Sequence, residues 1–186
     1  MSGPAPVYLD HNATTPLDPR VFDAMRPYFL EHFGNPSSVE HAAGSAAADG
    51  VQRARDAFAQ AIGARSDEVT FTASCTESNN IAILGLARAL QKPGHFVTSA
   101  VEHPAVLEVF RHLQSEGHST TIVPVDEAGQ VRLEALEEAI GGSTALVSIM
   151  AANNEVGTLQ PLDRIAQLCA ARGALLHSDM AQMPAY

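Results

Sequence analysis

The sequence alternates short apolar segments with longer segments of helical period, and this alternation constrains the fold most strongly. The apolar segments have the length of β-strands, and each segment between them is long enough for a helix with its turns. The predicted strands are Glu68–Thr72, His95–Ala100, Thr120–Pro124, Thr144–Met150 and Ala174–Ser178. The predicted helices between them lie near residues 76–91, 103–116, 132–140 and 161–172. Because such long connections form right-handed crossovers, the sequence predicts an α/β fold with a mostly parallel sheet and flanking helices.

The residues before the first predicted strand have a different pattern. An irregular arm, interrupted by Pro, Asn, Asp and Gly, contains one short predicted helix at about 18–31. An Ala-rich helix follows at about 42–62, and Gly63 suits its C-cap. We therefore expect an N-terminal arm with a short helix over residues 1–41 and an α/β domain over residues 42–186.

Charge and composition exclude several classes of protein. The 186 residues include 21 Asp and Glu against 11 Lys and Arg, a net charge of −10, so we expect no nucleic-acid partner. No apolar run approaches the roughly 18 residues of a membrane span, and no secretion signal opens the chain, so we expect no membrane association. The two cysteines, Cys75 and Cys169, are too few for a disulfide framework or a structural zinc site, which favours a reducing cytoplasm.

Small and hydroxyl residues follow the first predicted strand and lead into a helix. Ser74, Cys75 and Thr76 would lie at its first turn, where free N–H groups and the positive end of the helix dipole favour an anion such as phosphate. The alternative is ordinary capping by Ser74 or Thr76, with Glu77 in the first turn. Since the stretch lacks the lysine of a nucleotide-binding loop, an ATPase is not expected.

Three further polar groups follow later predicted strands. His103 comes after the second, Asn154 lies in a polar turn after the fourth, and Asp179 follows the fifth, with Gln182 close behind. Each has an ordinary structural explanation: a cap or surface histidine, a turn asparagine and an N-cap aspartate. Because ligand groups gather at the carboxyl ends of parallel strands, their convergence with the expected phosphate cradle predicts a binding site.

Six segments carry a resemblance to a known family. They are Tyr8–Pro16, Phe33–Ser38 with His41, Phe71–Ser78, Val101–Leu107, Asn153–Gly157 and His177–Asp179 with Gln182. In these segments and their order, from about residue 7 to 183, the chain resembles the N-terminal half of a cysteine desulfurase, in the class V aminotransferase group of pyridoxal-phosphate enzymes. The resemblance implies the large domain of a PLP-dependent transferase, truncated at its C-terminal side and without the C-terminal small domain.

The resemblance also implies roles for particular side chains. The implied cofactor-binding residues are Ser74, Cys75, Thr76, His103, Asn154, Asp179 and Gln182. Asp179 would pair with the pyridine nitrogen, and His103 would stack on the ring and take a catalytic role by moving protons. Asn154 and Gln182 would bond near the ring 3-hydroxyl.

The implied reaction removes sulfur from L-cysteine to give alanine and an enzyme persulfide. The sulfur would pass to acceptor or scaffold proteins that serve iron–sulfur cluster assembly or other sulfur delivery, and family members act as homodimers. The family's cofactor lysine and persulfide cysteine are not among these residues. Lys92, the only lysine, precedes the second predicted strand at the wrong edge of the sheet, Cys75 lies in the phosphate loop, and Cys169 lies on an apolar helix face. We therefore predict that this chain alone is inactive.

Other functions stay open at this point. The chain could be a non-catalytic remnant or one subunit of a split enzyme. It could also come from a related class V enzyme such as a selenocysteine lyase. A generic α/β domain for a phosphorylated ligand is disfavoured by the six matching segments.

Overall fold

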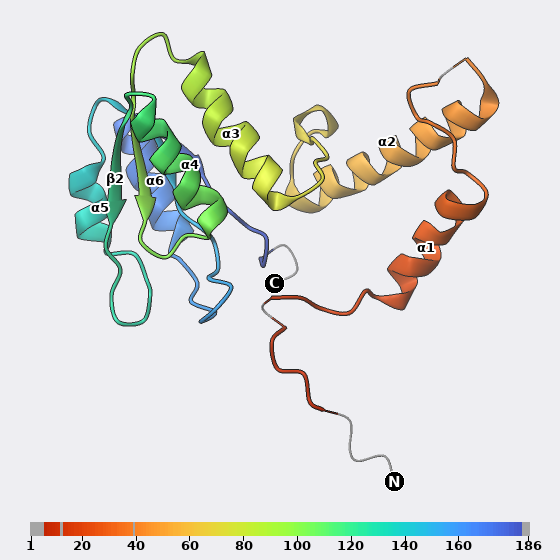
Figure 1. The fold of residues 1–186 in the computed structure, drawn as a ribbon, viewed down its shortest axis with the longest axis horizontal. Helices are drawn as coiled ribbons and strands as arrows, with labels where there is room; N and C mark the ends of the chain where they lie inside the picture. Colours follow the sequence, from red (N-terminus) through yellow and green to blue (C-terminus); the bar gives the residue numbers. More distant parts are fainter. Residues whose placement is uncertain (1–5, 12, 39, 184–186) are drawn as a thin grey trace. The chain divides into compact units, whose positions relative to one another are not determined.

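The computed structural model describes residues 6–11, 13–38 and 40–183 (Figure 1). These residues form two compact units. The first, here called the helical unit, is Thr15–Phe71 and contains α1 (Pro19–Leu30), α2 (Ala42–Ile62) and a short 3-10 helix, η1 (Ser66–Glu68). The second, the sheet unit, consists of the described residues on either side of it. Its helices are α3 (Cys75–Ala89), α4 (Pro104–Ser115), α5 (Leu133–Ala139) and α6 (Leu162–Arg172). Its strands are β1 (His95–Ser99), β2 (Ser119–Val123), β3 (Thr144–Ser148) and β4 (Leu175–His177).

The four strands form one parallel sheet with the order β2-β1-β3-β4. The chain moves outward from β1 to β2 through α4 and then returns across β1 to β3 through α5. Because right-handed crossovers in opposite directions cover opposite faces, this reversal places helices on both sides of the sheet. The predicted α/β fold with a mostly parallel sheet and flanking helices is confirmed.

Alternate residues of the two central strands, β1 and β3, supply two separate cores. Phe96 of β1 packs with the cluster of α3 and α4, whereas its neighbour Val97 packs with the cluster of α5 and α6. In the first cluster the Phe96 and Phe110 rings meet edge to face, with centroids 6.4 Å apart. The second cluster includes Cys169, so the predicted core position of that thiol is confirmed. Because β1 and β3 are buried on both faces, they carry apolar residues at consecutive positions.

Both predicted N-terminal helices are confirmed, and side chains cap the start of each. The Asp18 carboxylate accepts from the Arg20 N–H at 2.8 Å at the start of α1. The His41 Nδ1 accepts from the Gly44 N–H at 3.1 Å at the start of α2. Gly63 ends α2 in the left-handed conformation at φ 70°, as expected for a glycine C-cap.

The predicted strand Glu68–Thr72 is wrong. Its first residue ends η1, and the residues that follow pair with no strand among those described. A guanidinium N–H of Arg55 donates to the Val69 carbonyl, and the same guanidinium lies 5.2 Å from the centre of the Phe71 ring. Arg55 thus supplies a hydrogen bond to the Val69 carbonyl and covers the Phe71 ring, so this segment needs no neighbouring strand.

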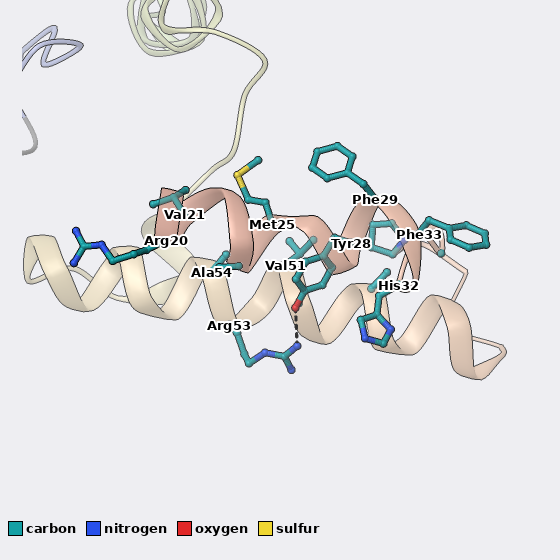
Figure 2. Close-up of a pocket in the computed structure, with 15 residues that line it drawn as sticks. Arg20, Val21, Met25, Tyr28, Phe29, His32, Phe33, Val51, Arg53 and Ala54 are labelled. Carbon is teal, nitrogen blue, oxygen red and sulfur yellow. Dashed lines mark hydrogen bonds between the residues drawn. The ribbon is translucent and has the colours of Figure 1, made fainter. Parts of the chain in front are cut away.

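An open apolar groove of about 1040 Å³ runs between α1 and α2 (Figure 2). Figure 2 shows the Tyr28 ring against α2, where its hydroxyl accepts a 3.0 Å hydrogen bond from Arg53. Met25 and Phe29 of α1 and Val51 of α2 line the groove with exposed side chains. No helix among the described residues is long and apolar enough to cross a membrane.

Candidate active site

The first turn of α3 keeps two backbone donors free. Ser74 is its N-cap and accepts from the Glu77 N–H at 3.2 Å, while the Glu77 carboxylate accepts from the Ala73 N–H at 2.6 Å. None of the described residues accepts from the N–H groups of Cys75 and Thr76. Capping by Ser74 and an anion site are therefore compatible, because two donors at the positive end of the helix remain available.

Asp179 lies just beyond β4 and is only 7% exposed. Its Oδ2 accepts from the Asn79 amide at 2.8 Å, and its Oδ1 accepts from the Cys75 thiol at 3.2 Å and from the Ala181 N–H at 3.0 Å. Burial alone would raise the pKa of Asp179, but these three hydrogen bonds outweigh burial and hold the pKa below its ordinary value. The carboxylate is therefore ionised at neutral pH.

The hydrogen bonds to Asp179 also leave room for a ligand. An ionised carboxylate offers about four lone-pair sites. Two donors from the described residues occupy Oδ1, and one, the Asn79 amide, occupies Oδ2. One lone-pair site on Oδ2 is left for a donor in the cavity.

His103 is the N-cap of α4, and its Nδ1 accepts from the Ala105 N–H at 3.1 Å. A neutral imidazole whose Nδ1 accepts carries its proton on Nε2. The sequence left two interpretations of His103 open, a helix cap and a site residue. The structure shows that it caps α4 and also lines the cavity. Its Nε2 is available to a ligand.

Glu102 is a second buried carboxylate, 4% exposed, directly before His103. It accepts from the Ser99 hydroxyl at 2.7 Å and from the Met150 N–H at 2.9 and 3.0 Å. Burial raises its pKa to about 7, the nearby charge of Asp179 acts in the same direction, and the two donors oppose the rise. Glu102 therefore ties the ends of β1 and β3 together beneath the site.

The polar turn after β3 is held by Asn153. Its side-chain oxygen accepts from the N–H groups of Glu155 and Val156 at 2.9 and 3.0 Å, and its amide donates to the Val101 carbonyl at 3.1 Å. This buried side chain fixes the turn to the loop that carries His103. The next residue, Asn154, is thereby presented to the site.

These groups surround one cavity of about 300 Å³. Its lining residues are Ala13, Cys75, Thr76, Asn79, His103, Ala105, Met150, Ala152, Asn154, Asp179, Ala181 and Gln182. Six of the seven predicted site residues are among them, and the seventh, Ser74, caps the helix that borders the cavity. Lys92 and Cys169 do not line it.

Sequence reasoning missed two residues of this site, Asn79 and Glu102. Asn79 lies four residues after Cys75 and so on the same face of α3, a spacing that could have connected the two. Glu102 ends an apolar segment, where an unpaired acid is uncommon. Their partners could not be read from spacing, since the Asn79 bond to Asp179 spans 100 positions.

The sequence profile of the aminotransferase class-V family matches residues 7–185, nearly the whole chain. The chain belongs to the aminotransferase class-V family. A cysteine desulfurase IscS of Rickettsia bellii (strain OSU 85-389) is 48% identical over 178 residues, which are 95% of this chain and 43% of that protein.

Solved structures of related proteins have the same fold. One, described as a NifS-like protein, matches with a TM-score of 0.89 at 39% identity over 92% of this chain and 48% of its own. Another, SspA in complex with cysteine, matches with a TM-score of 0.89 at 36% identity over 95% of this chain and 51% of its own. This class-V chain thus spans about half the length of the relatives it matches.

Proposed function

We propose that the cavity binds pyridoxal 5′-phosphate and that the chain corresponds to the N-terminal portion of a cysteine desulfurase. One observation carries the proposal: a single cavity combines free N–H donors at the start of α3 with a buried, ionised carboxylate that has one open acceptor site. The phosphate and the protonated ring nitrogen of the cofactor need these two complementary groups.

The residues present fit the cofactor. The N–H groups of Cys75 and Thr76, with the Thr76 hydroxyl, would hold the phosphate, and Ser74 keeps the helix end that presents them. Asp179 would accept from the ring N–H through the open site on Oδ2 and, being ionised, would keep that nitrogen protonated. When bound, the cofactor supplies an electron sink for the bonds of an amino acid α-carbon.

The remaining predicted residues would handle protons and the ring hydroxyl. His103 would hold or move a proton at Nε2, because its Nδ1 is committed to the α4 cap. Asn154 and Gln182 would hydrogen-bond near the 3-hydroxyl of the ring. Both line the cavity on the segments that follow β3 and β4.

The substrate in this proposal is L-cysteine, whose sulfur passes to acceptor or scaffold proteins, for example in iron–sulfur cluster assembly. Two similarities support it: the relative from Rickettsia is a cysteine desulfurase, and SspA was solved with cysteine. Neither Lys92 nor Cys169 lines the cavity, and the Cys75 thiol donates to Asp179, so this chain alone is expected to be inactive. A homodimer, a cytoplasmic location and a division into an arm (1–41) and a partial large domain (42–186) complete the proposal.

The test is a titration of the purified 186-residue chain with pyridoxal 5′-phosphate, followed by the change in cofactor absorbance and fluorescence. We expect saturable binding that Asp179→Ala weakens about tenfold or more, since it removes a charged hydrogen-bond acceptor. Asp163→Ala, an exposed acid in the first turn of α6, is the matched control and should bind as the unaltered chain does. Equal binding by both variants would contradict the assigned site. Cysteine-dependent sulfide release by this chain alone would contradict its expected inactivity.

A further inference from the structure

The carboxylate of Asp179 is held by the same helix that offers the free N–H groups. Asn79 and Cys75 lie on one face of α3, four residues apart, and each contacts a different oxygen of Asp179. Desolvation and the neighbouring carboxylate raise the pKa of Cys75 to about 11, so the thiol stays protonated and donates. Helix α3 therefore carries both the free N–H groups and the side chains that hold Asp179.

Asn79 is 2% exposed, and a buried side-chain amide is costly unless it is hydrogen-bonded. The only partner that the structure gives its amide, among the described residues, is the Asp179 Oδ2 at 2.8 Å. An amide nitrogen donates and cannot accept, so it takes one of the two lone-pair sites of that oxygen. The direction of the remaining site is then set by the position of Asn79.

We propose that Asn79 is a positioning residue: together with the Cys75 thiol, its amide orients Asp179 so that the open site on Oδ2 faces the ring nitrogen of a pyridine-type ligand. This inference rests on the proposed function, because it assigns how the same cavity recognises that ring. Asn79 acts through Asp179 and stabilises a ligand only when the ligand presents a ring N–H.

The test compares pyridoxal 5′-phosphate with its 1-deaza analogue, in which a C–H replaces the ring nitrogen. The unaltered chain should prefer the natural ring about tenfold, the effect of one charge-assisted hydrogen bond. Asn79→Ala should reduce this preference severalfold while changing affinity for the deaza analogue less than about twofold, since that analogue makes no such bond. Asn80→Ala is the matched control: its amide donates to the Thr76 carbonyl within α3, and the preference should persist.

A loss of affinity for both ligands by the same factor in Asn79→Ala would overturn the inference, because it would indicate a packing role. If Asn79→Ala does not fold by circular dichroism, Cys75→Ala provides the same readout from an exposed position, and an unchanged preference there overturns the inference. The two proposals fail differently. No binding of either ligand by the unaltered chain contradicts the proposed function, whereas binding with an unchanged preference in the variants contradicts only the role of Asn79.

Discussion

The two units of the molecule handle their apolar side chains in opposite ways. In the sheet unit, each face of the sheet is covered by helices, and large side chains such as Phe96, Phe110 and Ile165 are fully buried. In the helical unit, α1 has no buried residue, and Phe29 is 68% exposed. An amphipathic helix needs a surface against which its apolar stripe can pack, and α2 alone covers only part of that stripe.

The same contrast separates the groove and the candidate site, two of the cavities of the described residues. The larger one, between α1 and α2, is an apolar groove in which few polar groups converge. The smaller one, at the carboxyl ends of β1, β3 and β4, brings together an imidazole, amides, a carboxylate and a helix N-terminus. A binding or catalytic site depends on convergent polar groups more than on the volume of its cavity, so the smaller cavity is the candidate site. The groove instead leaves apolar side chains of α1 and α2 exposed to water.

The largest expected difference between the units is in the cost of removing a phenylalanine. Phe110→Ala should lower the free energy of unfolding by about 3–5 kcal/mol, because it opens a cavity against Phe96. Phe29→Ala, its matched control in the helical unit, should cost less than about 0.5 kcal/mol, since the ring is mostly in water already. Urea unfolding followed by far-ultraviolet circular dichroism measures both. Similar costs would show that Phe29 is buried in solution.

The second comparison concerns a buried and an exposed acid. The folded pKa of Glu102 is about 7, above the ordinary 4.5, so the folded chain keeps a proton that the unfolded chain releases between these values. The contribution of Glu102 to stability therefore falls as pH rises through this window, and Glu102→Gln should remove this contribution of about 1–3 kcal/mol from the pH profile. Glu40→Gln, at an exposed position of the helical unit, should leave the pH profile unchanged. Urea midpoints at pH values from about 5 to 8 test this sign, and a steeper fall in Glu102→Gln would contradict it.

Most of the sheet unit could be predicted from sequence because its central strands, β1 and β3, are buried on both faces. Thr144–Met150, for example, carries apolar residues at consecutive positions, a pattern that is typical of a buried strand between helices of regular length. Glu68–Thr72 misled the same reasoning. Its apolar residues alternate as in a strand, but Arg55 bonds the Val69 carbonyl and lies over the Phe71 ring. No local sequence pattern encodes such contacts between segments.

The candidate site shows the same limit. His103, Asn154 and Asp179 could be selected because they follow strands, and the structure brings them to one cavity. Their roles toward a cofactor stay predictions. Asn79 and Glu102 escaped selection because their importance lies in bonds to residues distant in sequence, and these depend on the placement of β3 beside β1 and of β4 beside β3.

A third comparison uses one helical glycine from each unit. Gly85 of α3 has open space around it, so Gly85→Ala should stabilise the chain by about 0.5–1 kcal/mol through helix propensity. At Gly50 of α2 an added Cβ would lie 2.4 Å from the Tyr28 ring, which must move and lose its bond from Arg53. Gly50→Ala should therefore gain nothing or lose up to about 1 kcal/mol. Thermal unfolding separates the two, and equal stabilisation by both would show that the α1–α2 contact is loose.

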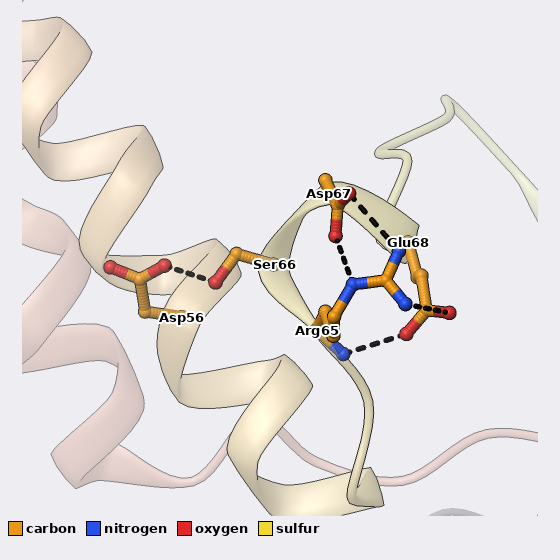
Figure 3. A network of polar contacts seen from close by, with 5 residues as sticks. All are labelled: Asp56, Arg65, Ser66, Asp67 and Glu68. Atoms are coloured by element: carbon orange, nitrogen blue, oxygen red, sulfur yellow. Dashed lines mark hydrogen bonds and ion pairs between the residues drawn. The ribbon is translucent and has the colours of Figure 1, made fainter.

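The smallest effect is expected at the ion pairs around η1 in the helical unit (Figure 3). Arg65 lies 3.0 Å from Asp67 and 3.1 Å from Glu68, yet its side chain is 71% exposed. Water and salt screen such pairs, so Arg65→Ala should cost about 0.5 kcal/mol or less. Arg55→Ala, the matched control, should cost about 1 kcal/mol, because it removes a hydrogen bond to the Val69 carbonyl and a contact with Phe71. Urea unfolding at low and high salt tests this order. A larger loss of unfolding free energy in Arg65→Ala than in Arg55→Ala would contradict this order. It would show that the ion pairs of Arg65 stabilise residues 65–71 more than the Arg55 bond to the Val69 carbonyl does.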